Sequence, residues 1–76
     1  MSAAYAIKRH ESVQVVYGHS VLEVWLERGV VYAQDESENV VRHVGPRRWC
    51  GQAGQVADNA LIDKLEAKYM YLMGWR

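Results

Sequence analysis

The change in hydrophobic spacing near residue 58 constrains this chain more than any other feature. After that point apolar residues recur at intervals of three and four, which places them along one side of an α-helix. They are Leu61, Ile62, Leu65, Tyr69, Leu72 and Met73. Asp58 is a suitable N-cap and Gly74 a suitable stop signal. The spacing predicts one helix between these residues, with Asp63 and Glu66 on its solvated side.

The residues before Asp58 follow a different period. Apolar side chains at every second position indicate two strands, one with Val13, Val15 and Tyr17 and the other with Leu22, Val24 and Leu26. Turns are expected at 18–19 and 28–29, where glycine accepts a positive φ. A third strand is predicted at 30–33 and a fourth at 40–44, ended by Gly45-Pro46. The expected sheet is an antiparallel meander.

Residues 20–28 also permit a second interpretation. Ser20 and Glu23 have the spacing of a capping box, and Gly29 could end a helix of two turns. Against this, Glu23 and Glu27 would repel each other four residues apart on that helix. We favour the strand and leave the helix as the alternative.

These patterns predict an α+β fold, in which a small antiparallel, meander-like sheet of three to four strands packs against one C-terminal amphipathic helix. Residues 1–76 should form a single domain, because a chain of 76 residues buries only about 60% of the surface that its unfolded form exposes. Half of the residues are hydrophobic, as expected of an ordered protein. A homodimer would add buried surface to so small a core.

Charge and cysteine content indicate which partners and which cellular compartment to expect. Nine basic and nine acidic residues cancel, so the overall charge does not steer the chain toward nucleic acid or anionic lipid. Cys50 is the only cysteine and cannot form a disulfide within the chain, which fits a reducing compartment. No apolar run approaches the roughly 18 to 20 residues that a bilayer requires. We expect a cytoplasmic protein without a membrane partner.

The sequence contains few arrangements that point to catalysis. Cys50 and His43 could in principle form a nucleophilic pair, although a lone cysteine beside a tryptophan is more often a small buried residue. The three histidines and Cys50 lack the spacing of a zinc site. We therefore predict no catalytic residues, no metal and no cofactor, and treat a small enzyme centred on Cys50 and His43 as a remote alternative.

A basic segment is the most distinctive local feature. Arg42, Arg47, Arg48 and Trp49 lie close together in the sequence and are candidate partner-binding residues. Arginine forks can bind phosphate and tryptophan can stack on a base, so nucleic acid is one option. Contact with a protein is favoured, because the positive charge is small and the acidic cluster at 35–38 could neutralise it. The structural alternative is a strand end and loop in which the tryptophan packs into the core and the arginines are solvated.

The end of the chain is the second candidate surface. Met70, Tyr71 and Trp75 fall outside the apolar stripe of the predicted helix. Tyrosine and tryptophan are frequent anchors of protein interfaces, and methionine adapts to irregular surfaces. These three residues complete the predicted partner-binding set.

The chain is therefore predicted to be a non-enzymatic module that binds a larger protein or protein complex and modulates or inhibits it. The alternative is a small nucleic-acid-binding regulator that uses the segment from Arg42 to Trp49. In size and make-up the chain resembles the small proteins with which bacteriophages and mobile elements inhibit host machinery, including anti-CRISPR proteins. That resemblance rests on no motif and assigns no functional residue.

Overall fold

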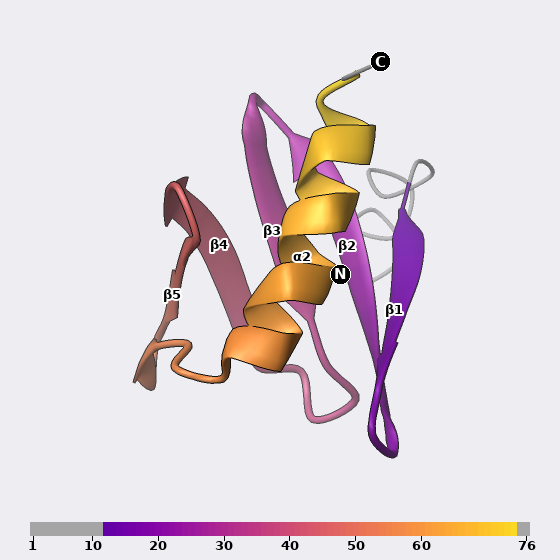
Figure 1. Cartoon of the computed structure of the whole chain (residues 1–76), viewed down its shortest axis with the longest axis vertical. Helices are drawn as coiled ribbons and strands as arrows, with labels where there is room; N and C mark the ends of the chain where they lie inside the picture. Colours follow the sequence, from indigo (N-terminus) through magenta and orange to yellow (C-terminus); the bar gives the residue numbers. More distant parts are fainter. Residues whose placement is uncertain (1–11, 75–76) are drawn as a thin grey trace.

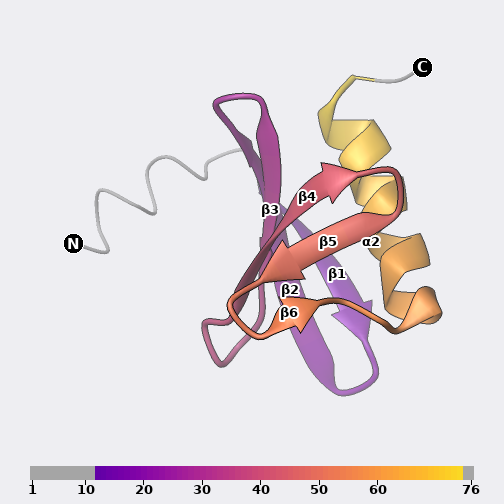
Figure 2. The ribbon, with the colours of Figure 1, turned by 90° about the vertical axis from the view of Figure 1, so that its left-hand side faces the viewer.

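The computed structural model describes residues 12–74, in which one antiparallel sheet of six strands carries a helix on one side (Figure 1). The elements are β1 (Val13–Tyr17), β2 (Ser20–Glu27), β3 (Val30–Gln34), β4 (Val40–Gly45), β5 (Arg48–Gly51), β6 (Gly54–Gln55) and α2 (Asn59–Leu72). Each strand pairs with the next one in the chain, so the spatial order is β1-β2-β3-β4-β5-β6. Figure 2 shows α2 on one side of this sheet. The predicted α+β class is confirmed.

The predicted number of strands is wrong, because the sheet has six rather than three to four. Pro46 does not end the sheet but lies in the turn between β4 and β5. The short strands β5 and β6 contain glycine and polar residues and lack the valine-rich sequences of β1 to β4. Gly51 permits the close pairing, since a Cβ atom there would meet the carbonyl oxygen of Val40 and lie 2.9 Å from Cγ1 of Val41.

Residues 20–28 follow the strand interpretation, with β2 covering Ser20–Glu27. The two-residue turn between β2 and β3 places Arg28 at φ 53° and Gly29 at φ 81°. Two successive positive φ values are typical of the type I′ turn, whose twist matches that of the flanking strands. The helical alternative is wrong because residues 20–27 pair with β1 and β3 along their length.

Helix α2 begins and ends where its capping residues predict. Asp58 Oδ1 accepts hydrogen bonds from the backbone N–H groups of Ala60 at 2.9 Å and Leu61 at 3.3 Å. At the other end the N–H of Met73 donates to the carbonyl oxygen of Tyr69, and Gly74 takes a φ of 83°. These contacts satisfy backbone groups that a helix end otherwise leaves unpaired.

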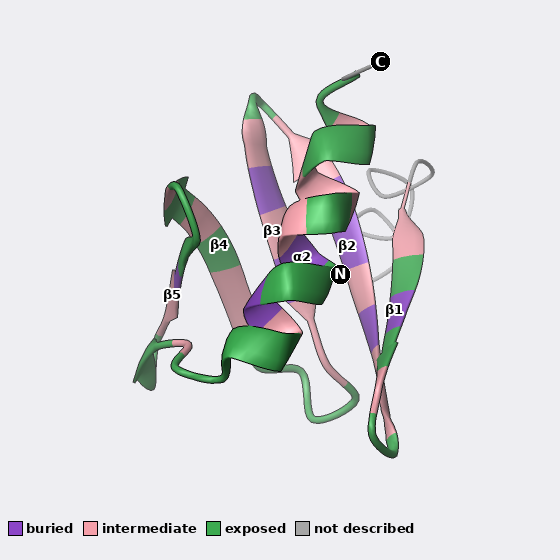
Figure 3. Cartoon of the chain, in the orientation of Figure 1, coloured by how far each residue is buried: buried purple, intermediate pink, exposed green. Residues whose placement is uncertain are grey.

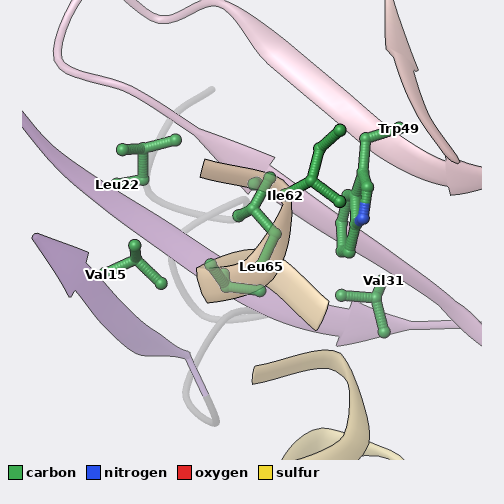
Figure 4. Close-up of a cluster of buried hydrophobic side chains, with 8 residues drawn as sticks. Val15, Leu22, Val31, Trp49, Ile62 and Leu65 are labelled. Carbon is green, nitrogen blue, oxygen red and sulfur yellow. The ribbon is translucent and has the colours of Figure 1, made fainter. Parts of the chain in front are cut away.

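The core lies between the sheet and α2 (Figure 4). Val15, Leu22, Val31 and Trp49 from four strands converge there with Ile62 and Leu65 of the helix. The helix buries only its inner side, and its outward side is exposed (Figure 3). Fourteen residues of moderate hydropathy make α2 too short and too polar to cross a membrane, and residues 12–74 contain no other helix.

The sheet face turned away from α2 is here called the outer face. Registered pairs place Trp25, Tyr32, Arg42 and Cys50 in one row across β2 to β5 on this face. Trp25 is buried, stacks on Tyr32 with ring centroids 5.5 Å apart, and donates from Nε1 to Glu27 at 3.1 Å. The sheet therefore has an ordered aromatic pair on the side opposite the main core.

Candidate functional site

The turn between β4 and β5 is held against the helix by two carboxylates. Arg47 lies in this turn at φ 57°, a left-handed conformation that costs a residue with a side chain about 1 kcal/mol or more. Its backbone N–H donates to Glu66 Oε2 at 3.1 Å, and its Nη1 lies 2.6 Å from Asp63 Oδ1. These contacts offset the unfavourable backbone conformation and attach the turn to α2.

Glu66 is the centre of this junction, because the same Oε2 atom also accepts a hydrogen bond from Trp49 Nε1 at 2.9 Å. Trp49 is fully buried, with 0% of its surface exposed. Its indole N–H is therefore satisfied by a carboxylate at the margin of the core. The expectation that Glu66 belongs to the solvated side of the helix is wrong, since the β4–β5 hairpin covers it.

His43 completes the junction by ring contacts. Its imidazole stacks on Tyr69 at a centroid distance of 3.9 Å and meets the edge of Trp49 at 5.0 Å. Nε2 lies 3.4 Å from Glu66 Oε2, near enough for ion pairing on protonation but without the alignment of a hydrogen bond. We call His43, Arg47, Trp49, Glu66 and Tyr69 the hairpin–helix junction.

The junction does not bring Cys50 to His43. His43 pairs with Trp49 and faces α2, whereas Cys50 pairs with Arg42 one position along and faces the opposite side of the sheet. The thiol and the imidazole thus lie on different faces and cannot act as a nucleophile and its base in this arrangement. Within residues 12–74, no three His, Cys, Asp or Glu side chains are grouped as a metal ion would require.

The structure divides the basic segment that the sequence presented as one surface. Arg42 and Arg48 are exposed and belong to the outer face, with Cys50 between them in strand alternation. Arg47 points the other way, toward Asp63. Trp49 is in the core, so it cannot contribute contact surface to a partner unless the protein opens.

The acidic cluster at 35–38 does not neutralise these arginines. Asp35 instead closes its own loop, because its Oδ1 accepts from the backbone N–H groups of Ser37 at 2.9 Å and Asn39 at 3.0 Å. In the part of the chain that the structure describes, the side chains of Arg42 and Arg48 have no ion-pair partner. Two unpaired guanidinium groups therefore remain on the outer face.

The end of α2 exposes three large apolar side chains, which we call the helix-end patch. Met70, Tyr71 and Met73 expose 47%, 67% and 42% of their surfaces. Met70 and Tyr71 were predicted to lie off the apolar stripe, whereas Met73 was assigned to that stripe and instead faces solvent. The third predicted residue of this region, Trp75, lies outside the described residues.

Two shallow hollows accompany these surfaces. One, of about 330 Å³, lies between the β3–β4 loop and the β5–β6 hairpin and includes Val40, Gly51 and Val56 in its walls. The other, of about 350 Å³, lies between β1 and α2 and is lined by Gln14, Val15, Val16, Lys64, Ala67 and Lys68. Neither follows from a local sequence motif, since each depends on which segments the fold places together.

Comparisons of this chain with protein families, with curated proteins and with solved structures find no match.

Proposed function

We propose that this protein acts by binding a larger protein and not by catalysis, with the helix-end patch as a contact surface. The observation that carries the proposal is the exposure of Met70, Tyr71 and Met73 at the end of a capped helix. Tyrosine and methionine in such a position supply the large, adaptable contact area that interfaces use. Several large apolar side chains exposed at one end of a small domain favour association.

The separation of His43 from Cys50 supports the non-catalytic part of this proposal. The carboxylate–imidazole pair that does exist, Glu66 with His43, lies in the hairpin–helix junction among aromatic rings. Its carboxylate is occupied in hydrogen bonds to Arg47 and Trp49. These side chains act as structural contacts of the turn and the core.

Replacing Tyr71 by Ala should weaken partner binding by about 2 kcal/mol, roughly 30-fold in Kd, while leaving the fold intact. The partner is first captured on the immobilised wild-type protein from a host lysate and identified by mass spectrometry. Its affinity for each variant is then measured by calorimetry. Val44→Ser, which alters another exposed apolar residue, is the matched control. Equal affinity of wild type and Tyr71→Ala would contradict the assignment, and concentration-dependent sizing would reveal a second copy as the partner.

A more specific form of the proposal is that this protein comes from a phage or mobile element. Its partner is then part of the host machinery, which the protein inhibits. Chain size and make-up are the only support for this form of the proposal. It requires that the captured partner lose activity when the purified protein is added, and an unaffected partner would refute it.

Nucleic-acid binding is the second candidate, favoured by the position of Arg42 beside Tyr32 and of Arg48 on the same outer face. Two arginine–phosphate contacts to a single strand give a slope of about −1.4 in log K against log salt. Affinity for a labelled oligonucleotide should then fall roughly sevenfold between about 50 and 200 mM salt. The variant Arg42→Glu/Arg48→Glu should lose this binding, while Arg28→Glu, at an exposed turn, should retain it. Salt-independent binding would exclude the candidate.

A further inference from the structure

Within residues 12–74, the edge of β1 carries backbone groups without a strand partner. β1 pairs with β2, and no described residue forms a strand on its other side. The two-residue hairpin pairs Tyr17 with Ser20, and the residues next to such a loop form a hydrogen-bonded pair. Hydrogen-bonded pairs alternate along an antiparallel ladder. Gln14 and Val16 therefore direct their N–H and C=O groups away from the sheet, toward the open edge.

This edge lacks the features by which proteins usually prevent strand addition. Such features are charged side chains, proline, a bulge, or a very short strand. The sequence of β1 is Val-Gln-Val-Val-Tyr, its pairing with β2 is regular over five residues, and Val16 exposes 61% of its surface. The opposite edge strand, β6, has only two residues. Among the strands that the structure describes, β1 is thus the edge that can accept another strand.

The helix supplies a wall beside that edge. Figure 1 shows α2 and β1 side by side, and the hollow of about 350 Å³ between them is bordered on the helix by Lys64, Ala67 and Lys68. Ala67 is small enough for a backbone to come close. The two lysines have no ion-pair partner among residues 12–74. Their positions four residues apart give a separation of about 6 Å along the helix, which is comparable to the roughly 6.6 Å between alternate residues of a strand.

From these observations we propose that the β1 edge and the adjoining side of α2 form a groove for an extended acidic peptide segment of a partner protein. The segment adds to β1 as an antiparallel strand, with carboxylates at positions i and i+2 turned toward Lys64 and Lys68. The side chains at positions i−1, i+1 and i+3 are uncharged and lie on the outer face. Glu23, which accepts a hydrogen bond from Gln14 at 3.1 Å, lies on that outer face.

The inference rests on the proposed function in that the occupant is a protein, but it uses a surface separate from the helix-end patch. An experiment can therefore contradict the peptide groove without contradicting the helix-end patch, and the reverse. Tyr71→Ser should leave peptide binding unchanged, and loss of binding in that variant would move the peptide to the helix end.

The first experiment uses three synthetic peptides with an uncharged fluorescent label, measured by fluorescence anisotropy. Thr-Val-Glu-Thr-Glu-Val-Thr presents both carboxylates on one side of a strand, whereas Thr-Val-Thr-Glu-Glu-Val-Thr has the same composition with one on each side. Thr-Val-Lys-Thr-Lys-Val-Thr reverses the charge. The first peptide should bind roughly three- to fivefold more tightly than the second, which keeps one carboxylate on the lysine side, and at least about tenfold more tightly than the third. Equal affinities, or no binding of the first peptide, would overturn the proposal.

The second experiment exchanges the charges. The double variant Lys64→Glu/Lys68→Glu should lose at least about tenfold in affinity for the glutamate peptide and gain affinity for the lysine peptide. A gain of binding cannot come from misfolding, so this result does not depend on how well the variant folds. Arg48→Glu, an equivalent reversal on β5, should leave the order of affinities unchanged. Failure of the charge exchange would exclude the two lysines as the recognition element.

A third experiment tests strand pairing without altering the protein. The N–H of the central threonine in the glutamate peptide should point at β1, because its side chain lies on the same face as Gln14 and Val16. N-methylation of that threonine should abolish binding, whereas N-methylation of the glutamates, whose N–H groups point away, should be tolerated. Equal effects would overturn strand addition. Dimerisation lost on Val16→Lys, with no peptide binding, would assign the edge to a second copy and likewise overturn the proposal.

Discussion

Replacing Trp49 by Ala should remove most of the stability of the protein at 25 °C. Truncation of a buried tryptophan costs about 3 to 5 kcal/mol, because the lost burial is compounded by the cavity left behind. A domain of this size has a total stability of only about 5 kcal/mol or somewhat more. Trp49 has no exposed surface and contacts β4 and α2 through His43 and Tyr69. Urea unfolding followed by far-UV circular dichroism measures the loss.

The matched control is Tyr71→Ala, which removes an aromatic side chain from the exposed side of the same core helix. Its free energy of unfolding should change by less than about 0.5 kcal/mol. Trp49→Phe, which keeps a ring and removes the indole N–H, should fall between the two. Comparable losses in Trp49→Ala and Tyr71→Ala would contradict the burial of Trp49 and return it to the candidate contact surface.

Replacing Glu66 by Ala should destabilise the protein by about 2 to 3 kcal/mol, a large effect for a partly exposed residue. The substitution leaves the indole N–H of Trp49 buried without an acceptor, and hydrogen bonds to a charged group each contribute about 1.5 to 3 kcal/mol. It also releases the backbone N–H of Arg47, which holds the β4–β5 turn. Urea unfolding of both proteins gives the difference.

Asp63→Ala is the control for Glu66→Ala, since both carboxylates lie on α2 and both contact Arg47. The Arg47–Asp63 pair is exposed on both sides, and such pairs contribute about 0 to 1 kcal/mol. The two substitutions should therefore differ by at least about 1 kcal/mol. If Asp63→Ala proves as costly as Glu66→Ala, the ion pair with Arg47, and not the hydrogen bond to Trp49, stabilises the junction.

The parts of the fold that depend on local sequence were predictable. Helix α2 has its N-cap, its stop signal and its apolar stripe within seventeen consecutive residues, 58–74, and these determine its bounds whatever it packs against. Strands β1 and β2 show apolar residues at alternate positions, β3 and β4 begin with pairs of valines, and glycines or polar residues mark the turns between the four strands. The pattern fails for β5 and β6, where pairing to β4 supplies the order and the residues themselves show little strand preference.

The candidate site was less predictable because its members meet only through strand register. Whether Trp49 or its neighbours Arg48 and Cys50 face the helix depends on how β5 pairs with β4, including the irregularity between His43 and Gly45. A one-residue shift would exchange the faces. Glu66 lies off the stripe on a helical wheel, and nothing local shows that a hairpin from 19 residues away will reach its carboxylate. The exposure of Met70 and Tyr71 required only the helical period, so that expectation agreed with the structure.

The strict succession of neighbouring strands has a kinetic consequence. Partners in the sheet are separated by short stretches of chain, so loop closure takes little entropy and hairpins can extend the sheet one strand at a time. The apolar side of that growing sheet has no cover until the segment at 59–72 has left the ribosome. A nascent chain would therefore present an open β-surface during synthesis and close it in a late docking step.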